Sequence, residues 1–179
     1  MVYKIQIDRE TKLIIPTVDY ASQIFDVIDN DREYLSEWLS WVQYVQSEQD
    51  VTDNILERIE LFRKKKAASF YGLYNNQFVA SVGFISIDER NKEGEIGYWL
   101  SSEFQGKGLM TKFVKACIEY GFEELELNRI VIKCASENQK SAGVAKRLGF
   151  TYEGTLRQDR CRDGIFYDTQ VYSLLKSKY

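Results

Sequence analysis

The stretch from position 94 to position 112 reads Gly94-Glu-Ile-Gly-Tyr-Trp-Leu-Ser-Ser-Glu-Phe-Gln-Gly-Lys-Gly-Leu-Met-Thr-Lys112. It predicts a strand over Glu93–Leu100, a short loop and a helix that begins after Gly108. Glycines in such a loop let successive backbone N–H groups turn towards one point, and the first helical turn adds unpaired N–H groups with a partial positive charge. The pattern therefore predicts a pyrophosphate cradle, to which Lys107 would add a cation.

A tight turn is the competing interpretation of this loop, because two glycines by themselves are a weak signal. Two familiar nucleotide-binding loops are excluded. The loop lacks the three-glycine fingerprint of dinucleotide-binding proteins, and it lacks the Gly-Lys-Ser/Thr triplet of ATP-binding loops.

A second informative segment reads Cys134-Ala-Ser-Glu-Asn-Gln-Lys-Ser-Ala-Gly-Val-Ala-Lys-Arg-Leu-Gly-Phe150. A strand is predicted over Arg129–Ala135, and a short helix over Ser141–Leu148 is stopped by Gly149. Asn138 and Ser141 bracket the start of that helix. Both are ordinary capping residues, so plain capping and a binding role are both open at this point.

Helical patterns dominate the first third of the chain. A short strand over Lys12–Pro16 is followed by Thr17, which can cap a helix over Val18–Asp29. A second helical stretch is predicted over Glu33–Tyr44, and a third over Thr52–Lys66. The second carries an unusually wide apolar belt, which can be buried on one side and line a cleft on the other.

The rest of the chain adds strands around two turns. Asn75-Asn76 and Asp163-Gly164 are typical turn sequences. The strands flanking them are predicted over Ser69–Tyr74, Phe78–Asp88, Thr151–Arg160 and Phe166–Leu175. This order predicts an α/β (α+β) fold with a mixed, mostly antiparallel sheet flanked by helices. We find no repeat and no linker, so residues 1–179 are expected to form a single domain.

Composition excludes several classes of function. The formal net charge is −3, which argues against nucleic-acid binding. The chain has no histidine, so Ser-His and Cys-His catalytic pairs are excluded. Cys117, Cys134 and Cys161 match no zinc or disulfide pattern, and no metal is expected. The absence of a signal peptide and of a long apolar run predicts a cytoplasmic protein without a membrane segment.

The two segments, taken in this order, resemble the GNAT acetyltransferase superfamily. Gln105-Gly-Lys-Gly108 resembles its Gln/Arg-x-x-Gly-x-Gly/Ala coenzyme A signature, and Asn138-x-x-Ser141 followed by Leu148-Gly-Phe150 resembles its second coenzyme-contacting element. Within the second helical stretch, Glu33-Tyr-Leu-Ser-Glu-Trp-Leu-Ser-Trp41 resembles the helix that opens the RimJ/RimL branch, the bacterial ribosomal-protein N-acetyltransferases. The C-terminal part, from Leu148 to Leu175, resembles the same branch.

The resemblance implies the GNAT fold and acetyl-CoA as cosubstrate. Two positions depart from the family pattern. Met110 stands where the signature has Gly or Ala, and Ala145 stands where many members have a Tyr that protonates the departing thiolate. The coenzyme contacts that the resemblance implies are Tyr98, Trp99, Leu100, Gln105, Gly106, Lys107, Gly108, Leu109, Met110, Thr111, Asn138 and Ser141.

Acetyl transfer to an amine needs a base, donors for the oxyanion and a proton for the thiolate. Resemblance assigns the acid role to Ser141, and backbone groups of a bulged strand at Tyr98–Leu100 would contact the acetyl and pantetheine groups. Glu95 is a candidate base acting through a water, or else an ordinary ion-pair partner. Trp38 and Trp41 are candidates for the acceptor groove, or else core residues.

By resemblance, the expected acceptor is the N-terminal α-amine of a peptide or protein, and the expected protein is a ribosomal one. A small amine such as a polyamine or aminoglycoside is the first alternative, which Asp31, Glu33 and Glu37 near the cleft leave open. A coenzyme-binding module without turnover is the second. The aromatic-rich sequence is also compatible with a homodimer or a higher homo-oligomer.

Overall fold

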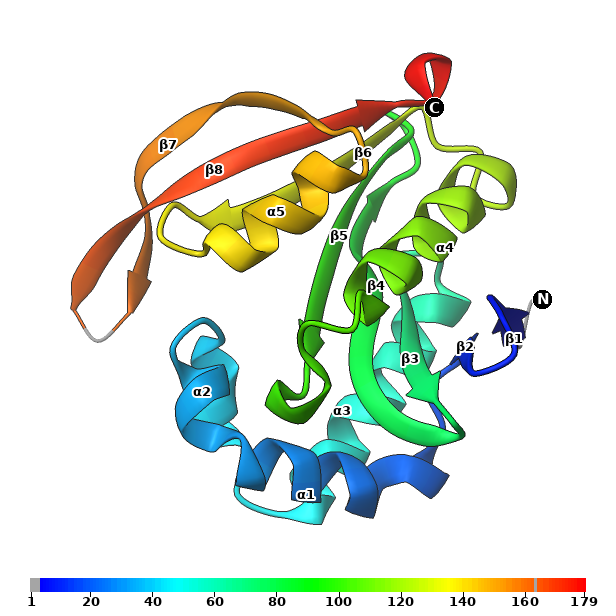
Figure 1. Ribbon diagram of the computed structural model, residues 1–179, viewed down its shortest axis with the longest axis vertical. Coiled ribbons are helices and arrows are strands. Elements are labelled where there is room, and N and C mark those ends of the chain that lie inside the picture. Colours follow the sequence, from blue (N-terminus) through cyan, green and yellow to red (C-terminus); the bar gives the residue numbers. More distant parts are fainter. Residues whose placement is uncertain (1–3, 163) are drawn as a thin grey trace.

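The structure is a computed structural model that describes residues 4–162 and 164–179 of the chain. Figure 1 shows a twisted sheet with helices on both faces. The strands are β1 Lys4–Gln6, β2 Thr11–Ile14, β3 Ala68–Tyr74, β4 Gln77–Asp88, β5 Glu93–Leu100, β6 Arg129–Ala135, β7 Thr151–Arg162 and β8 Ile165–Leu175. The α-helices are α1 Ala21–Asn30, α2 Arg32–Ser36, α3 Glu48–Arg63, α4 Leu109–Glu123 and α5 Gln139–Arg147.

The eight strands form one sheet in the order β1-β2-β3-β4-β5-β6-β8-β7. Every neighbouring pair is antiparallel except β5 and β6, which run parallel. A parallel pair needs a crossover connection, and α4 supplies it. The predicted mixed, mostly antiparallel sheet is confirmed, and β5 and β6 have the predicted bounds.

Each face of the sheet has its own hydrophobic core. One core packs α4 and α5 against the sheet and contains Phe84, Phe113 and Ile132, all of which are fully buried. The other packs α1, α2 and α3 against the opposite face around Leu35, Ile55 and Phe78. Because side chains alternate along a strand, consecutive residues of β5 contribute to different cores.

The segment over Glu33–Tyr44 differs from the single predicted helix. It forms the five-residue α2, then breaks, and resumes as a 3-10 turn over Ser40–Tyr44, called η2. Leu39 marks the break with an extended backbone, φ −122° and ψ 95°. The apolar belt that looked wide for one helix is therefore divided between two short elements.

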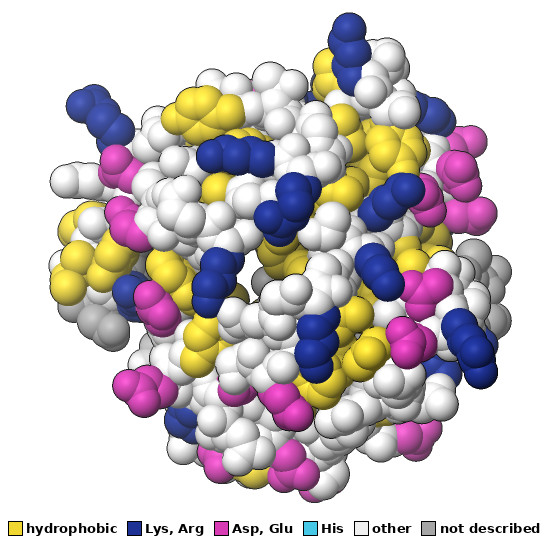
Figure 2. Space-filling model, viewed as in Figure 1, with side chains coloured by type: hydrophobic (Ala, Val, Ile, Leu, Met, Phe, Trp, Pro, Cys, Tyr) yellow, Lys and Arg dark blue, Asp and Glu magenta, His cyan; other side chains and the backbone are white. Residues whose placement is uncertain are grey.

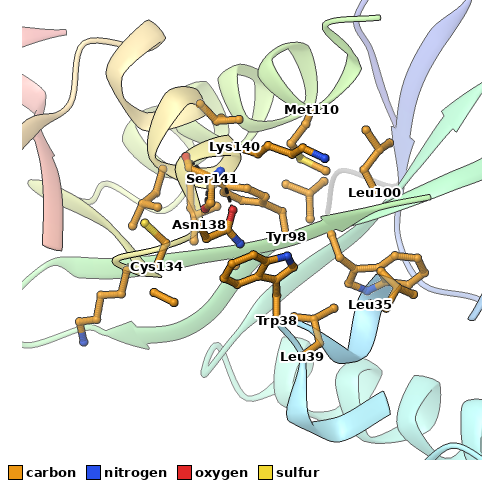
Figure 3. A pocket seen from close by; sticks show the side chains of 18 of the residues that line it. Leu35, Trp38, Leu39, Tyr98, Leu100, Met110, Cys134, Asn138, Lys140 and Ser141 are labelled. Carbon is orange, nitrogen blue, oxygen red and sulfur yellow. Dashed lines mark hydrogen bonds between the residues drawn. The ribbon is translucent and has the colours of Figure 1, made fainter. Parts of the chain in front are cut away.

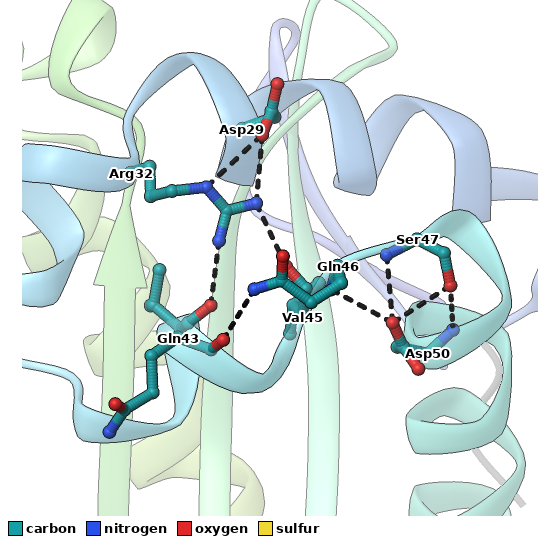
Figure 4. A network of polar contacts seen from close by, with 8 residues as sticks. Asp29, Arg32, Gln43, Val45, Gln46, Ser47 and Asp50 are labelled. Carbon is teal, nitrogen blue, oxygen red and sulfur yellow. Dashed lines mark hydrogen bonds and ion pairs between the residues drawn. The ribbon is translucent and has the colours of Figure 1, made fainter.

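Arg32 fixes the path of this broken segment. Its guanidinium donates to the carbonyl oxygens of Val42 at 3.0 Å and Val45 at 2.9 Å, and it pairs with Asp29 (Figure 4). The Val42 carbonyl also accepts from the Val45 backbone N–H at 3.2 Å, so Arg32 adds a second donor where the 3-10 turn ends. The bonds hold η2 close to the end of α1.

Helix α3 begins at Glu48, four residues before the predicted start. The cause is a capping box, in which the Ser47 side chain accepts from the Asp50 backbone and the Asp50 carboxylate accepts from Ser47 (Figure 4). At the N-terminal end of α1, Thr17 does cap as predicted, although the first residues form a 3-10 turn, Val18–Tyr20.

The remaining differences are at element ends. Strand β2 ends at Ile14, two residues before the predicted end, and β1 was not predicted. Gly164 has the positive φ of 77° expected of a turn, while Asp163 lies outside the described residues. No helix within residues 4–162 and 164–179 combines the length and apolar character needed to cross a membrane.

Strands β5 and β6 separate part-way along their length. Glu93, Gly94 and Glu95 pair with Arg129, Ile130 and Val131. Beyond Glu95, the described part of β6 offers no partner to β5 and pairs with β8 alone. The predicted bulge lies in β4 at Ile85, rather than in β5, and adds twist beside the point of separation.

Candidate active site

The separation of β5 and β6 opens a cleft of about 1120 Å³. Figure 2 shows a hollow near the middle of this face with dark-blue Lys and Arg side chains around it. The cleft is lined by the ends of β5, the loop before α4, the start of α5 and the segment after α2. All the residues predicted for the site line it except Lys107, so the fold brings together positions up to 103 residues apart, from Trp38 to Ser141.

The glycine loop and the start of α4 form the first part of the site. Gly106 and Gly108 have φ values of 76° and 71°, a region that favours glycine. Within the described residues, the backbone N–H groups of Gly106 to Thr111 make no hydrogen bond. A row of free amides at a helix N-terminus suits an anion, as predicted for a pyrophosphate.

The Lys107 side chain does not lie in this part of the cleft. Its ammonium lies over the ring of Phe104, 4.8 Å from the centroid, and near Tyr74. The aromatic faces attract the cation away from the loop. The prediction that Lys107 adds a cation to the cradle is therefore not supported by its position.

Two basic residues of α5 line the cleft instead, and sequence reasoning missed both. Lys140 donates to the Gln105 side chain at 2.7 Å, and Arg147 approaches the Thr111 hydroxyl at 3.4 Å. They are seven residues apart, about two helical turns, so they lie on one face of α5. That spacing was the available signal.

Ser141 is held by two partners at the opposite side of the cleft from Trp38 (Figure 3). The Asn138 side chain accepts from the Ser141 backbone at 2.9 Å, which is the capping bond. The Tyr98 hydroxyl lies 2.9 Å from Oγ of Ser141 and donates to its carbonyl oxygen at 3.1 Å. The side chain of Tyr98 was not predicted to take part.

Burial raises the pKa of Tyr98, so its hydroxyl stays protonated at neutral pH. The Cys134 thiol is also close to Ser141, and burial raises its pKa as well. Cys117 of α4 is fully buried in the core, which makes its thiol inert. Ala145 is equally buried, so a longer side chain at that position would have no room without repacking.

The register of β4 and β5 decides which β5 amides face the cleft. Ser101 donates to Val79 of β4 at 2.9 Å. In an antiparallel pair, alternate residues bond to the neighbouring strand, so Trp99 turns its N–H towards β4. Tyr98 and Leu100 turn theirs towards the cleft. The register therefore favours two of the three predicted backbone contacts and not that of Trp99.

Glu95 is half of an ion pair. Its carboxylate lies 2.9 Å from the ammonium of Lys133 on β6, and its side chain is only 18% exposed. The ion-pair interpretation of Glu95 is thus what the structure displays. A base role would require that carboxylate to take a proton while it stays beside Lys133.

Aromatic side chains form the remaining wall. Trp38 and Trp41 are half-buried and line the cleft, and the Trp41 ring packs 6.2 Å from that of Trp99. Their segment is anchored by Arg32, and by Asp31, which accepts from the backbone of Ser102 at 2.8 Å. The wall is therefore tied to the turn that follows β5.

Comparison with known proteins identifies relatives along almost the whole chain. The family model described as an acetyltransferase (GNAT) domain matches residues 13–151. The ribosomal-protein-serine acetyltransferase of Escherichia coli strain K12 is 30% identical over 173 residues, which cover 97% of each chain.

Two solved structures are similar over the whole fold. RimL, a ribosomal L7/L12 α-N-protein acetyltransferase solved with coenzyme A in a disulfide to a cysteine, gives a TM-score of 0.93 at 27% identity and covers 96% of this chain and 97% of its own. The microcin C7 self-immunity acetyltransferase MccE, solved with acetyl-CoA and AMP, gives a TM-score of 0.92 at 30% identity. The match covers 98% of this chain and 97% of MccE.

The free amides at the start of α4 and the slot between β5 and β6 fit the diphosphate and the pantetheine arm of acetyl-CoA, which supplies the acetyl group as a thioester. The chain belongs to the GNAT acetyltransferase family and is an acetyl-CoA-dependent N-acetyltransferase.

Proposed function

We propose that this enzyme acetylates the N-terminal α-amine of a protein, and that the acceptor is a ribosomal protein. The observation that carries the proposal is similarity over 97% of the chain to a ribosomal-protein-serine acetyltransferase. The acceptor side of the cleft is walled by Trp38, Trp41 and Trp99. Flat aromatic rings offer a large apolar contact area to an acceptor.

The residues divide into two groups in this proposal. The amides of Gly106 to Thr111 hold the diphosphate, with Lys140 and Arg147 nearby, and the N–H groups of Tyr98 and Leu100 bond the thioester end. Ser141 protonates the thiolate as it leaves. Tyr98 positions the Ser141 hydroxyl, since the two oxygens are 2.9 Å apart. Glu95 remains the candidate base, acting through a water.

The charge of the cleft supports a peptide over a polycation. Six basic side chains line it, against three acidic ones, Glu37, Glu95 and Glu137. Asp31, Glu33 and Glu37 are the carboxylates that left a polyamine acceptor as an alternative. Of these, Asp31 accepts a hydrogen bond from Ser102, and Glu33 does not line the cleft. A cationic acceptor would meet net repulsion there.

A second candidate is an amine carried by a nucleotide-bearing small molecule. The similar protein MccE was solved with AMP beside acetyl-CoA. The excess of basic side chains in this cleft also favours an anionic acceptor.

Intact-mass analysis tests the proposal. Ribosomal proteins stripped of N-terminal acetyl groups are incubated with enzyme and acetyl-CoA. We expect one acetyl increment on one protein, mapped to its N-terminus, and formation of that product about 100-fold more slowly with the Ser141→Ala variant. Acetylation of free amines or aminoacyl nucleotides, with no ribosomal protein modified, would contradict it and favour the second candidate.

We also propose a homo-oligomer in the cytoplasm, built from one domain spanning residues 1–179. Strand β7 is an exposed sheet edge, and Leu156, Ile165 and Phe166 of the β7–β8 hairpin are 45–60% exposed. Exposed edges and apolar side chains favour association. Light scattering coupled to size-exclusion chromatography would give the mass, and a monomer at micromolar concentration would contradict this part.

A further inference from the structure

Arg58 of α3 is a charged group without a charged partner. Its guanidinium donates to the Asn54 side chain at 2.8 Å and to the Ser69 hydroxyl at 2.9 Å. No carboxylate of the described residues lies within 4.0 Å of it. Arg58 is half-buried, and the loss of solvation lowers its pKa. Burial of a charge is costly unless an opposite charge compensates it.

The unused guanidinium donors are open to the cleft. A guanidinium has five N–H donors, and the bonds to Asn54 and Ser69 use two of them. Arg58 lines the cleft and is not among the buried groups that lack a partner. The remaining donors are therefore within reach of a bound molecule.

Small residues form part of the cleft floor beside Arg58. Ser69 of β3, Gly83 of β4 and Gly97 of β5 lie in one row across the sheet, and all three line the cleft. Gly83 has φ 149°, and an added Cβ would lie 2.2 Å from the carbonyl oxygen of Ala68. This row, called the channel below, leads from β5 to Arg58, and the Ile85 side chain packs against it at Gly97, where an added Cβ would lie 2.8 Å from Cγ2 of Ile85.

This channel lies on the face opposite the predicted diphosphate site. Trp99 points to the α3 face, whereas its neighbour Tyr98 packs with the core around α4 and α5. The free amides at the start of α4 are on the Tyr98 side. Arg58 is therefore on the acceptor side and is not a further coenzyme contact.

The channel also has a defined length. Ser69 and Gly97 both pair with Gly83, so they are two strand spacings apart, roughly 10 Å. An extended peptide covers that distance with about three residues.

We propose that Arg58 binds an oxyanion of the acceptor, a carboxylate or a phosphate carried within about three residues of the amine that is acetylated. The inference rests on the proposed function for the position of that amine. Two further basic side chains of the cleft are already engaged. Lys133 pairs with Glu95, and Arg162 bonds the Tyr167 hydroxyl at 3.2 Å.

Matched peptides test this specificity. Ser-Ala-Asp-Ala, Ser-Ala-Asn-Ala and a peptide with phosphoserine in third place are compared by kcat/KM, with an Asp scan over positions one to four. We expect the wild-type enzyme to prefer an acidic peptide to its neutral match by roughly tenfold, the effect of one charge-assisted hydrogen bond. A higher kcat/KM for either the Asp peptide or the phosphoserine peptide supports the proposal and shows whether a carboxylate or a phosphate is bound.

The variant Arg58→Met should reduce that preference to about one, and Arg58→Lys should keep part of it. The ratio between two peptides is independent of how much of a variant is folded. Two variants serve as controls. Ser69→Ala removes the hydroxyl that accepts from Arg58 and keeps the guanidinium. Arg63→Met removes an exposed charge from the same helix. Both controls should retain the preference. No preference in the wild type, or an equal preference in Arg58→Met, would overturn the proposal.

A binding measurement separates this proposal from the proposed function. If no peptide is acetylated, the same peptides are titrated into the coenzyme A complex and followed by tryptophan fluorescence, since Trp41 and Trp99 line the cleft. Tighter binding of the acidic peptide that is lost in Arg58→Met supports the oxyanion site while the proposed function fails. Equal binding of acidic and neutral peptides overturns the oxyanion site.

Discussion

The two ends of the β5–β6 pair differ in what their residues bond to. At the closed end, Glu93 to Glu95 pair with β6, and Arg129 bonds Glu93 at 2.6 Å and Glu153 of β7. At the open end, the inward amides of Tyr98 and Leu100 and those of Gly106 to Thr111 have no protein partner among the described residues. The same strand thus supplies stability at one end and binding groups at the other.

The site is therefore built from backbone N–H groups that have no hydrogen-bond partner among the described residues. Unsatisfied amides cost free energy unless water or a ligand compensates them. The bonds from Arg129 to Glu93 and Glu153 hold β5 and β6 together at the closed end, so the two strands separate only in the second half of β5. Changes at the open end should therefore affect catalysis and binding, and changes at the closed end should affect stability.

The largest effect is expected from Ser141→Ala. Removing the acid should lower kcat by about 100-fold, because general acid catalysis contributes about that much or more. The KM for acetyl-CoA should change little. Steady-state kinetics measures both. A fall in kcat of less than fivefold would mean that another group, such as the nearby Cys134, protonates the thiolate.

Gly108→Val should weaken coenzyme A binding by roughly tenfold, since a side chain at positive φ strains the loop that presents the amides. Calorimetry gives the dissociation constant. Gly164→Val is the matched control, because Gly164 has φ 77° against 71° for Gly108 and does not line the cleft. Equal losses in both variants would show that the effect is general strain.

Tyr98→Phe should lower kcat by about fivefold, the typical net value of one hydrogen bond. Because Tyr98 acts through Ser141, adding Tyr98→Phe to Ser141→Ala should lower kcat no further. If the double variant has a lower kcat than Ser141→Ala alone, Tyr98 contacts the reacting groups itself.

Glu153→Gln tests the closed end and should leave coenzyme A binding within twofold. Hydrogen bonds from Arg129 and Ser173 lower the pKa of Glu153 from 4.5 to about 2. A lowered folded pKa contributes stability that is present above pH 4.5 and is lost as the pH falls towards 2. Because the carboxylate is partly exposed, we expect a loss of only about 1 kcal/mol at pH 7.

Urea unfolding at several pH values measures this difference. The gap between wild type and Glu153→Gln should narrow as the pH falls from 5 to about 2. A gap that stays constant with pH would mean that the Glu153 carboxylate contributes through packing and not through its charge.

The sequence predicted the elements around the cleft better than the side chains within it. β5, β6 and the start of α4 follow from local pattern and from Gly106 and Gly108. The site of Ser141 followed from resemblance. The bulge at Ile85 and the break at Leu39 depend on neighbouring strands and on Arg32, so local pattern cannot locate them.

The direction of a long side chain is equally beyond local pattern. Lys107 turns to Phe104, which a 3-10 turn after β5 places beside it. Arg58 looks like an ordinary surface residue of an amphipathic helix, and only the fold places it over Ser69. Lys140 and Arg147 were within reach of sequence reasoning, because their spacing of seven residues puts them on one face of α5.

Residue-resolved amide NMR with and without acetyl-CoA tests the central claim most directly. We expect large shifts and slower hydrogen exchange for Gly106 to Thr111, Tyr98 and Leu100. Trp99, whose N–H is directed to β4, should change less. Unchanged amides at 106–111 in a protein saturated with acetyl-CoA would contradict the claim that the open end of β5 is the coenzyme site.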